Sequence, residues 1–211
     1  MSTRGESDPA VSGEQYNPGP ATAPRQAATV ILLRGGADAL EVLLVRRTLK
    51  ARFMGGVWVF PGGAVDAHEG DGDQAHRAAA IRELREEAAI ELDDPAALVK
   101  FSRWITPAQV QIRFDTHFFL APLPPGQQPA VDGAEVVELG WFTPQAALDA
   151  HAAQRIVLVF PTIKHLEQLS AFATVQELLS YARDQDVQPV EPKVLLEGEV
   201  ARVLLPGDPG Y

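Results

Sequence analysis

Apolar, β-branched runs alternate with polar, turn-forming segments through the first part of the chain. Residues 28–34 (ATVILLR) and 40–47 (LEVLLVRR) are two such runs, and Gly35-Gly36-Ala37-Asp38 lies between them. Two apolar runs joined by a short segment rich in glycine and aspartate are typical of a β-hairpin. Residues 57–60 (VWVF) continue the strand pattern up to a glycine turn. We therefore expect strands in all three runs.

The stretch from residue 60 to residue 90, FPGGAVDAHEGDGDQAHRAAAIRELREEAAI, combines a glycine turn, a polar loop and a helix. At about 100° per residue, three glutamates share one arc of the helix: Glu83, Glu86 and Glu87. The opposite face carries the residues expected to pack on a core: Ile81, Leu84 and Ala88. Carboxylates on one exposed edge repel each other, and a hard divalent cation converts that repulsion into binding. Arg82 lies one turn before Glu86 and can orient its carboxylate. Taken alone, the segment 82–87 (RELREE) is more typical of an ordinary solvated helix face.

The later pattern predicts further strands, then helices, then a hairpin. Strands are expected at 97–104 and 116–121, and a further strand that carries Trp141 after a loop that contains Glu135. Helices are expected at 144–153, 161–170 and 174–184, and a late hairpin at 194–196 and 200–205. Thr143 followed by Pro144 resembles a helix N-cap with proline at the first helical position. Residues 1–26 are rich in Gly, Pro, Ser and charge, which predicts a disordered or loosely attached arm. The alternative is that the part around Tyr16 packs across a partner subunit. Residues 27–211 are expected to form a single domain.

Composition narrows the classes of partner. The chain has 211 residues and 46% hydrophobic content, which suits one domain with a sizeable core. Its net charge of −10 argues against nucleic acid or an anionic membrane as the main partner. The absence of cysteine excludes disulfides and thiolate chemistry. Neither a signal-peptide core nor an apolar run of membrane-spanning length is present, so a cytoplasmic location is the default expectation.

The context of the glutamate helix resembles the Nudix hydrolases, whose signature is Gly-x5-Glu-x7-Arg-Glu-U-x-Glu-Glu-x-Gly-U, with U a bulky aliphatic residue. The positions that match are Gly63, Glu69, Arg82, Glu83, Leu84, Glu86, Glu87 and Ile90, so the box spans 63–90. Twelve residues, rather than seven, separate Glu69 from Arg82, which lengthens the loop and leaves the position of Glu69 open. Ala89 stands where the family has glycine, which suggests that the helix continues past Ile90.

A second resemblance concerns the segment ahead of the box. A subgroup of Nudix enzymes acting on coenzyme A has Leu-Leu-Thr-x-Arg-(Ser/Ala)-x3-Arg-x3-Gly-x3-Phe-Pro-Gly-Gly. This chain matches at Leu43, Leu44, Arg47, Arg52, Gly56, Phe60, Pro61, Gly62 and Gly63, and departs at Val45 and Thr48. With the longer box and the segments 104–107 and 113–119, the chain is similar to the peroxisomal branch of coenzyme A-directed Nudix hydrolases and its bacterial relatives.

These resemblances imply an α/β fold, a Nudix-like α/β/α sandwich with a mixed β-sheet, carrying extra helices and a hairpin at about 161–205. They imply hydrolysis, with Mg²⁺ or Mn²⁺, of a small-molecule nucleoside diphosphate linked to another moiety, with coenzyme A or acyl-CoA favoured. The alternatives are an ADP-ribose or nucleotide-sugar pyrophosphatase and a non-catalytic nucleotide-binding module. A homodimer is compatible with the fold, because dimers are common in it.

The resemblance also implies roles for individual residues. The metal ligands would be Glu83, Glu86 and Glu87 with the backbone carbonyl of Gly62, and Arg82 would orient them. The catalytic base stays open between Glu83 and Glu135, with Glu138 as the alternate to Glu135. Substrate contacts are expected from Arg47, Arg52, Gly56 and Arg113. For Arg113, as for His117, an exposed strand position is the plain alternative.

Overall fold

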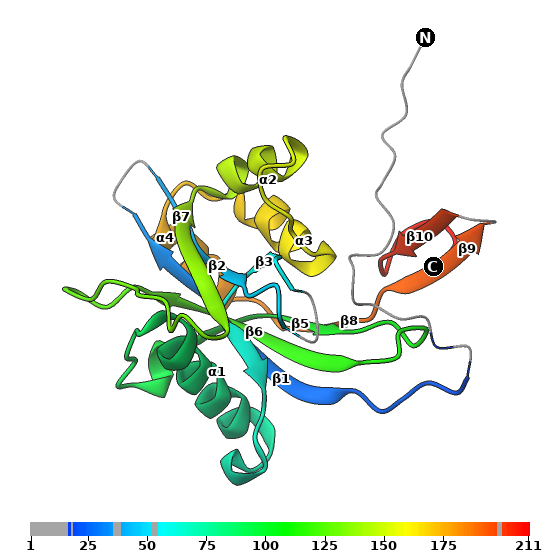
Figure 1. The fold of residues 1–211 in the computed structure, drawn as a ribbon, viewed down its shortest axis with the longest axis horizontal. Coiled ribbons are helices and arrows are strands. Elements are labelled where there is room, and N and C mark those ends of the chain that lie inside the picture. Colours follow the sequence, from blue (N-terminus) through cyan, green and yellow to red (C-terminus); the bar gives the residue numbers. More distant parts are fainter. Residues whose placement is uncertain (1–16, 18, 36–38, 52–54, 198–199) are drawn as a thin grey trace.

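The computed structural model describes residues 17, 19–35, 39–51, 55–197 and 200–211. A mixed sheet runs through its centre in the order β3-β2-β1-β6-β5-β8, with β4 paired to β1 and β7 paired to β2. The strands of this sheet are β1 (Arg25–Arg34), β2 (Glu41–Arg47), β3 (Trp58–Val59), β4 (Gly62–Ala64), β5 (Val99–Ile105), β6 (Phe114–Pro122), β7 (Val136–Phe142) and β8 (Pro189–Val190). Strands β9 (Lys193–Glu197) and β10 (Val200–Leu204) form a separate antiparallel pair, which extends beyond the main sheet in Figure 1.

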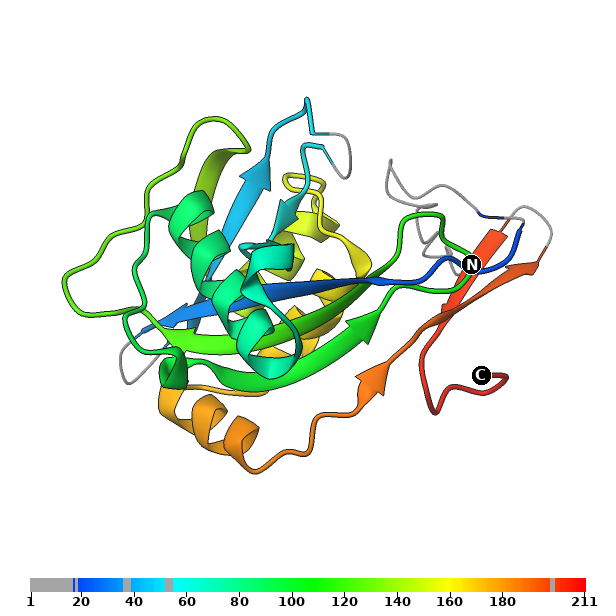
Figure 2. The ribbon, with the colours of Figure 1, turned by 90° about the horizontal axis from the view of Figure 1, so that it is seen from below.

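Helices cover both faces of the sheet (Figure 2). The helices are α1 (Gly72–Ala88), α2 (Pro144–Ala152), α3 (Phe160–Leu169) and α4 (Val175–Arg183), with short 3-10 turns at Ala67–Glu69 and Pro95–Ala97. Buried alanines of α1, including Ala79 and Ala80, pack with Val30 and Phe119 on one face. The other three helices enclose a second core on the opposite face. The expected α/β/α sandwich is therefore confirmed. Within the described residues, no helix is both long and apolar enough to cross a membrane.

Strand β1 shares one of its edges between two partners. Its first half pairs with β4, through Ala28↔Gly63 and Thr29↔Gly62, and its end pairs with β2, through Leu33↔Val42. Because antiparallel residues alternate in the direction of their hydrogen bonds, the Gly62 amide faces the edge of β4 that lies away from β1. At that free edge the Gly62 amide donates to Glu87 of α1 at 2.9 Å.

The expected strands, helices and late hairpin are all present, with small changes at their ends. Thr143 caps α2 as expected, since its hydroxyl oxygen accepts the Ala146 amide at 3.2 Å. The expectation that the box helix continues past Ile90 is wrong. Helix α1 ends at Ala88, and Ala89 adopts a left-handed conformation with φ 54° and ψ 32°. The Ala89 amide donates to the Arg85 carbonyl at 3.0 Å, and Ile90 is fully buried. Burial of Ile90 and this hydrogen bond outweigh the cost of about 1 kcal/mol for a non-glycine residue in this conformation.

The predicted amino-terminal arm falls mainly on residues 1–16 and 18, which lie outside the described residues, as does Tyr16. The described residues before β1 are held along the segment that precedes β6. The Asn17 amide donates to the Gln109 carbonyl at 2.7 Å, and the Thr22 hydroxyl donates to the Gln111 carbonyl at 3.0 Å. Strand β1 accordingly begins at Arg25, three residues before the expected strand.

His165 is a fully buried titratable group in the core beneath α3. Its ring centroid lies 4.2 Å from that of Phe118 and 5.5 Å from that of Trp104. Its Nε2 lies 2.6 Å from the Ser102 hydroxyl oxygen. Burial lowers the pKa of His165 to about 3. In the unfolded chain this histidine has an ordinary pKa of about 6.5, so it is protonated as the pH falls below that value, whereas in the folded chain it stays neutral. The free energy of unfolding therefore decreases as the pH falls.

We expect His165→Leu to reduce the acid sensitivity of folding. In the unaltered protein this histidine lowers the free energy of unfolding by about 2 kcal/mol between pH 7 and pH 5. The measurement is urea unfolding at both pH values. Ser102→Ala, which keeps the buried ring, should retain the full pH dependence. An identical pH dependence in His165→Leu and the unaltered protein would show that the buried ring does not contribute to the acid sensitivity.

Candidate functional site

The glutamate face of α1 is mostly buried, so the expectation of an exposed edge is wrong for two of its three members. Glu87 is 3% exposed and the Glu83 side chain 14%, whereas the Glu86 side chain is 51% exposed. Strand β4 covers this face. A Cβ built on Gly63 would overlap the Glu83 carboxylate, so glycine is required for so close an approach.

Arg82 connects the carboxylates of the box. Its Nε donates to Glu69 Oε1 at 3.0 Å, and its Nη1 donates to Glu83 Oε1 at 2.7 Å and to Glu86 Oε2 at 3.1 Å. Its Nη2 donates to the Ala64 carbonyl at 2.9 Å, on the free edge of β4. Hydrogen bonding to Glu69 raises the pKa of Arg82, so its positive charge is permanent. The expected contact with Glu86 is present, and the guanidinium also joins the helix to β4 and to the preceding loop.

Glu69 reaches this guanidinium despite the longer box. The Asp66 amide donates to Glu69 Oε2 at 2.6 Å, which fixes the 3-10 turn that carries the glutamate. Burial opposes ionisation of Glu69, but the hydrogen bond from Arg82 outweighs it and lowers the pKa of the carboxyl. Helix α1 begins at Gly72, so most of the residues between Glu69 and Arg82 are helical. The added length therefore lies largely in the helix and not in a loop.

Glu87 is the most confined carboxylate of the site. Burial raises its pKa to about 7, although the Gly62 amide donates to its Oε2 at 2.9 Å. The negative charges of Glu83 and Glu135 raise this pKa further, and Arg47, whose Nη1 lies 3.6 Å from Glu87 Oε1, opposes them. Within the described residues, Glu87 Oε1 is buried and has no hydrogen-bond partner.

Glu83 has the same kind of surroundings. Burial raises its pKa, the bond from Arg82 works in the opposite direction, and the charges of Glu86 and Glu135 add to the rise. Electrostatic interactions with Glu83 and Glu87 thus connect four carboxylates: Glu83, Glu86, Glu87 and Glu135. We call these four the carboxylate cluster.

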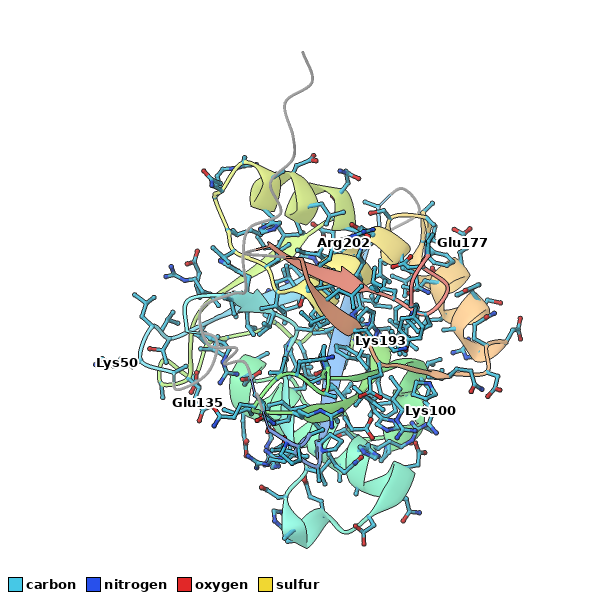
Figure 3. The ribbon with its side chains drawn as sticks, turned by 90° about the vertical axis from the view of Figure 1, so that its right-hand side faces the viewer. Lys50, Lys100, Glu135, Glu177, Lys193 and Arg202 are labelled. Carbon is cyan, nitrogen blue, oxygen red and sulfur yellow. The ribbon has the colours of Figure 1, made fainter. Side chains whose placement is uncertain are left out.

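Glu135 joins the carboxylate cluster from the loop before β7. The Asp132 carboxylate accepts the amides of Glu135 at 3.0 Å and Val136 at 2.9 Å. The Thr48 amide donates to the Glu135 carbonyl at 2.8 Å, which holds this loop beside the one that follows β2; Lys50 and Glu135 lie on the same side in Figure 3. The alternate, Glu138, instead pairs with Arg46 at 3.0 Å. The role of Asp132 in fixing this loop was not predicted from the sequence, although Asp132-Gly133 is a typical turn signal.

The expected substrate contacts are only partly brought together. Arg47 lies at the carboxylate cluster, and the Gly56 amide donates to the Arg47 carbonyl at 3.1 Å with Gly56 at φ 81°. Arg52 lies outside the described residues. Arg113 is not brought to the carboxylate cluster. Its buried guanidinium donates to the Thr106 carbonyl at 2.9 Å, to the Thr22 carbonyl at 2.8 Å and to the Glu191 carboxylate at 2.6 Å.

His117 also lies away from the carboxylate cluster. Its ring stacks on that of His76 of α1, with centroids 3.8 Å apart. The His76 Nε2 in turn lies 2.8 Å from the Gln26 side-chain oxygen. Burial lowers the pKa of His117 to about 4, so this stacked pair is uncharged at neutral pH.

The donors of the carboxylate cluster suit a hard divalent cation. They are all oxygens, they repel one another, and one of them is the buried Glu87 Oε1, which accepts no hydrogen bond from the residues that the structure describes. As they stand, no three acidic or imidazole side chains of the described residues converge closely enough to ligate one ion. Arg82 bonds to Glu83 and Glu86, and the Gly62 amide bonds to Glu87.

Comparison with known proteins identifies the family. The model of the NUDIX domain matches residues 23–160. The chain belongs to the Nudix hydrolase family. It is 28% identical over 182 residues to the putative nudix hydrolase 7 of Caenorhabditis elegans, covering 69% of this chain and 60% of that protein. It is 34% identical over 122 residues to the human acyl-coenzyme A diphosphatase NUDT19, covering 54% of this chain and 32% of that protein.

The chain thus spans less than two thirds of the length of these relatives. Among solved structures, a Nudix hydrolase from Alicyclobacillus acidocaldarius superposes with a TM-score of 0.67 at 27% identity, covering 75% of this chain and 96% of that one. The fold and the family are therefore those that the box predicts.

We expect Arg82→Lys to destabilise the fold, because an ammonium cannot hold Glu69, Glu83 and the Ala64 carbonyl together. The free energy of unfolding should fall by about 3 kcal/mol, as when a largely buried ion pair is broken. The measurement is urea unfolding at neutral pH. Arg85→Lys, on an exposed position of the same helix, is the matched control. Equal stability of both variants would contradict a structural role for the guanidinium.

Proposed function

We propose that this Nudix hydrolase cleaves the diphosphate of coenzyme A or an acyl-CoA with Mg²⁺ or Mn²⁺. The observation that carries the chemistry is the buried Glu87 Oε1, which accepts no hydrogen bond within the described part of the chain and lies among like-charged neighbours. Keeping a carboxylate in these surroundings costs folding free energy. A bound cation and a diphosphate would turn that cost into binding.

The ligands in this proposal are Glu83, Glu86 and Glu87, with the Gly62 carbonyl. When bound, the cation would neutralise charge on the diphosphate and lower the pKa of an attacking water. Arg82 holds two of these carboxylates in place, at 2.7 Å and 3.1 Å. Arg47, beside Glu87, supplies a fork of donors for a phosphate oxygen. Arg113 is left out of this site, because its donors are engaged elsewhere.

For the catalytic base we favour Glu135 over Glu83. Glu83 is hydrogen-bonded to Arg82, which suits a fixed ligand better than a proton acceptor. Glu135 is exposed, is held through its backbone by Asp132, and acts electrostatically on both Glu83 and Glu87. It can therefore accept a proton at the edge of the carboxylate cluster and pass it to solvent.

Two observations support coenzyme A as the substrate. The human relative that shares 34% identity over about half of this chain is named an acyl-coenzyme A diphosphatase. The chain also carries the subgroup motif through Arg47, Arg52 and Gly56. ADP-ribose or a nucleotide sugar is the second candidate, because the same carboxylates serve any nucleoside diphosphate. A non-catalytic module has no need for a complete carboxylate cluster, which disfavours it.

The test is release of phosphorylated products from coenzyme A, acyl-CoAs, ADP-ribose, NADH and UDP-glucose, with Mg²⁺ and then Mn²⁺. Coenzyme A forms should be cleaved preferentially. Glu86→Gln and Glu87→Gln should each lower kcat/KM by about 10³-fold or more, since a ligand to the cation contributes several kcal/mol. Glu91→Gln, an exposed position just beyond the helix, is the matched control and should retain turnover.

Three outcomes separate the alternatives. Near-normal turnover by both Gln variants would contradict the assignment of Glu86 and Glu87 as cation ligands. Preference for ADP-ribose or UDP-glucose would keep the carboxylate chemistry and discard coenzyme A. Binding of nucleotides without turnover of any of them would indicate the non-catalytic module.

A further inference from the structure

We propose that a cavity between β5, β6, the start of α3 and the β9–β10 hairpin binds the acyl group of a short-chain acyl-CoA. This inference rests on the proposed function, since it assigns a second site to the same substrate. It would make the enzyme selective for the length of the acyl chain, and not only for the diphosphate.

The cavity has a volume of about 110 Å³. Trp104 and Phe118 of the sheet form one wall and Phe160 of α3 another, with the Trp104 and Phe160 rings 6.2 Å apart edge to face. Val194 and Val203, which pair directly across β9 and β10, close the side toward the hairpin. The remaining lining residues are prolines, threonines and an isoleucine, so the described side chains around the cavity are all uncharged.

This lining suits an alkyl chain better than the other parts of the substrate. An adenine needs polar groups that match its edge, and the phosphates need cations or amides. The side-chain polar groups of the lining residues are the Thr106 and Thr116 hydroxyls and the Trp104 indole N–H, and the Thr106 hydroxyl oxygen already accepts the Phe114 amide at 3.0 Å. An apolar chain requires only removal from water, which aromatic and aliphatic walls provide.

The position of the cavity fits a substrate whose diphosphate lies at the carboxylate cluster. Gly62, Thr29 and Phe118 occupy one row across β4, β1 and β6. The carboxylate cluster lies at the Gly62 end of this row, on the free edge of β4, where Glu87 accepts a hydrogen bond from the Gly62 amide. The cavity meets this row at Phe118, whose side chain faces the core on the α3 side of the sheet and whose backbone lies two strand spacings, or about 10 Å, from that of Gly62. A coenzyme A thioester has a flexible pantetheine arm between its diphosphate and its acyl group, and this arm would cross the sheet over the partly exposed Thr29.

The volume of the cavity limits the length of the acyl chain that it can hold. A methylene is close in size to a water molecule, which occupies about 30 Å³ in the liquid. A cavity of about 110 Å³ therefore holds about four carbons, and a butyryl group should fill it. A palmitoyl chain would have to extend into solvent along the hairpin.

The experiment measures kcat/KM for coenzyme A and for acetyl-, butyryl-, octanoyl- and palmitoyl-CoA. We expect kcat/KM for butyryl-CoA to exceed that for coenzyme A by about tenfold, because its methylenes are buried. For the longer acyl chains we expect kcat/KM to decrease again. Val203→Trp, at a position 36% exposed, should fill the cavity and bring the ratio of butyryl-CoA to coenzyme A close to one. Phe160→Ala should enlarge the cavity and move the optimum to octanoyl-CoA. Tyr181→Ala, which removes an exposed aromatic ring on α4 outside the cavity, is the matched control.

The two proposals fail in different ways. Turnover of all coenzyme A forms at equal kcat/KM, or a chain-length profile unchanged in both cavity variants, would overturn the acyl site and leave the proposed function intact. Turnover of ADP-ribose with none of coenzyme A or its thioesters would overturn both.

Discussion

The site depends on how closely strand β4 approaches helix α1. Gly63 lies so near the Glu83 carboxylate that no side chain fits between them, and the Gly62 amide bonds to Glu87 at 2.9 Å. This contact removes two carboxylates from water and forces their charges together. Arg82 counters the repulsion by bonding at once to the helix, to Glu69 and to the β4 backbone. A side chain at position 63 would prevent so close an approach to the Glu83 carboxylate.

The same contact links stability to chemistry. A carboxyl with a pKa of about 7 is only partly ionised at neutral pH, so in the folded protein without a cation Glu87 is protonated part of the time. A divalent cation would favour the ionised form, and it would lower the free energy of the folded state by binding there and not to the unfolded chain. The fold thus keeps a strained electrostatic arrangement that a metal and a diphosphate would relieve. The core beneath α3, with its buried His165, is separate from this arrangement.

Local spacing predicted much of the fold and of the site, and its failures have a common cause. The period of the box helix correctly placed Glu83, Glu86 and Glu87 on one face, and the interval of four correctly paired Arg82 with Glu86. The burial of Glu87 could not be predicted, because it depends on which strand packs on that face. The left-handed Ala89 was missed because burial of Ile90 overrides the usual need for glycine. Arg113 was taken for a substrate contact because its bonds to Thr22 and Glu191 span 91 and 78 residues of sequence.

The most direct test of the central claim is Mn²⁺ binding to the purified protein, followed by the electron paramagnetic resonance signal of the free ion. We expect saturable binding by the unaltered protein and loss of that binding when Glu83, Glu86 and Glu87 are all replaced by glutamine. Mn²⁺ should also raise the unfolding temperature of the unaltered protein and not that of the variant. Equal Mn²⁺ binding by a folded triple variant would contradict the claim that these three carboxylates form the cation site.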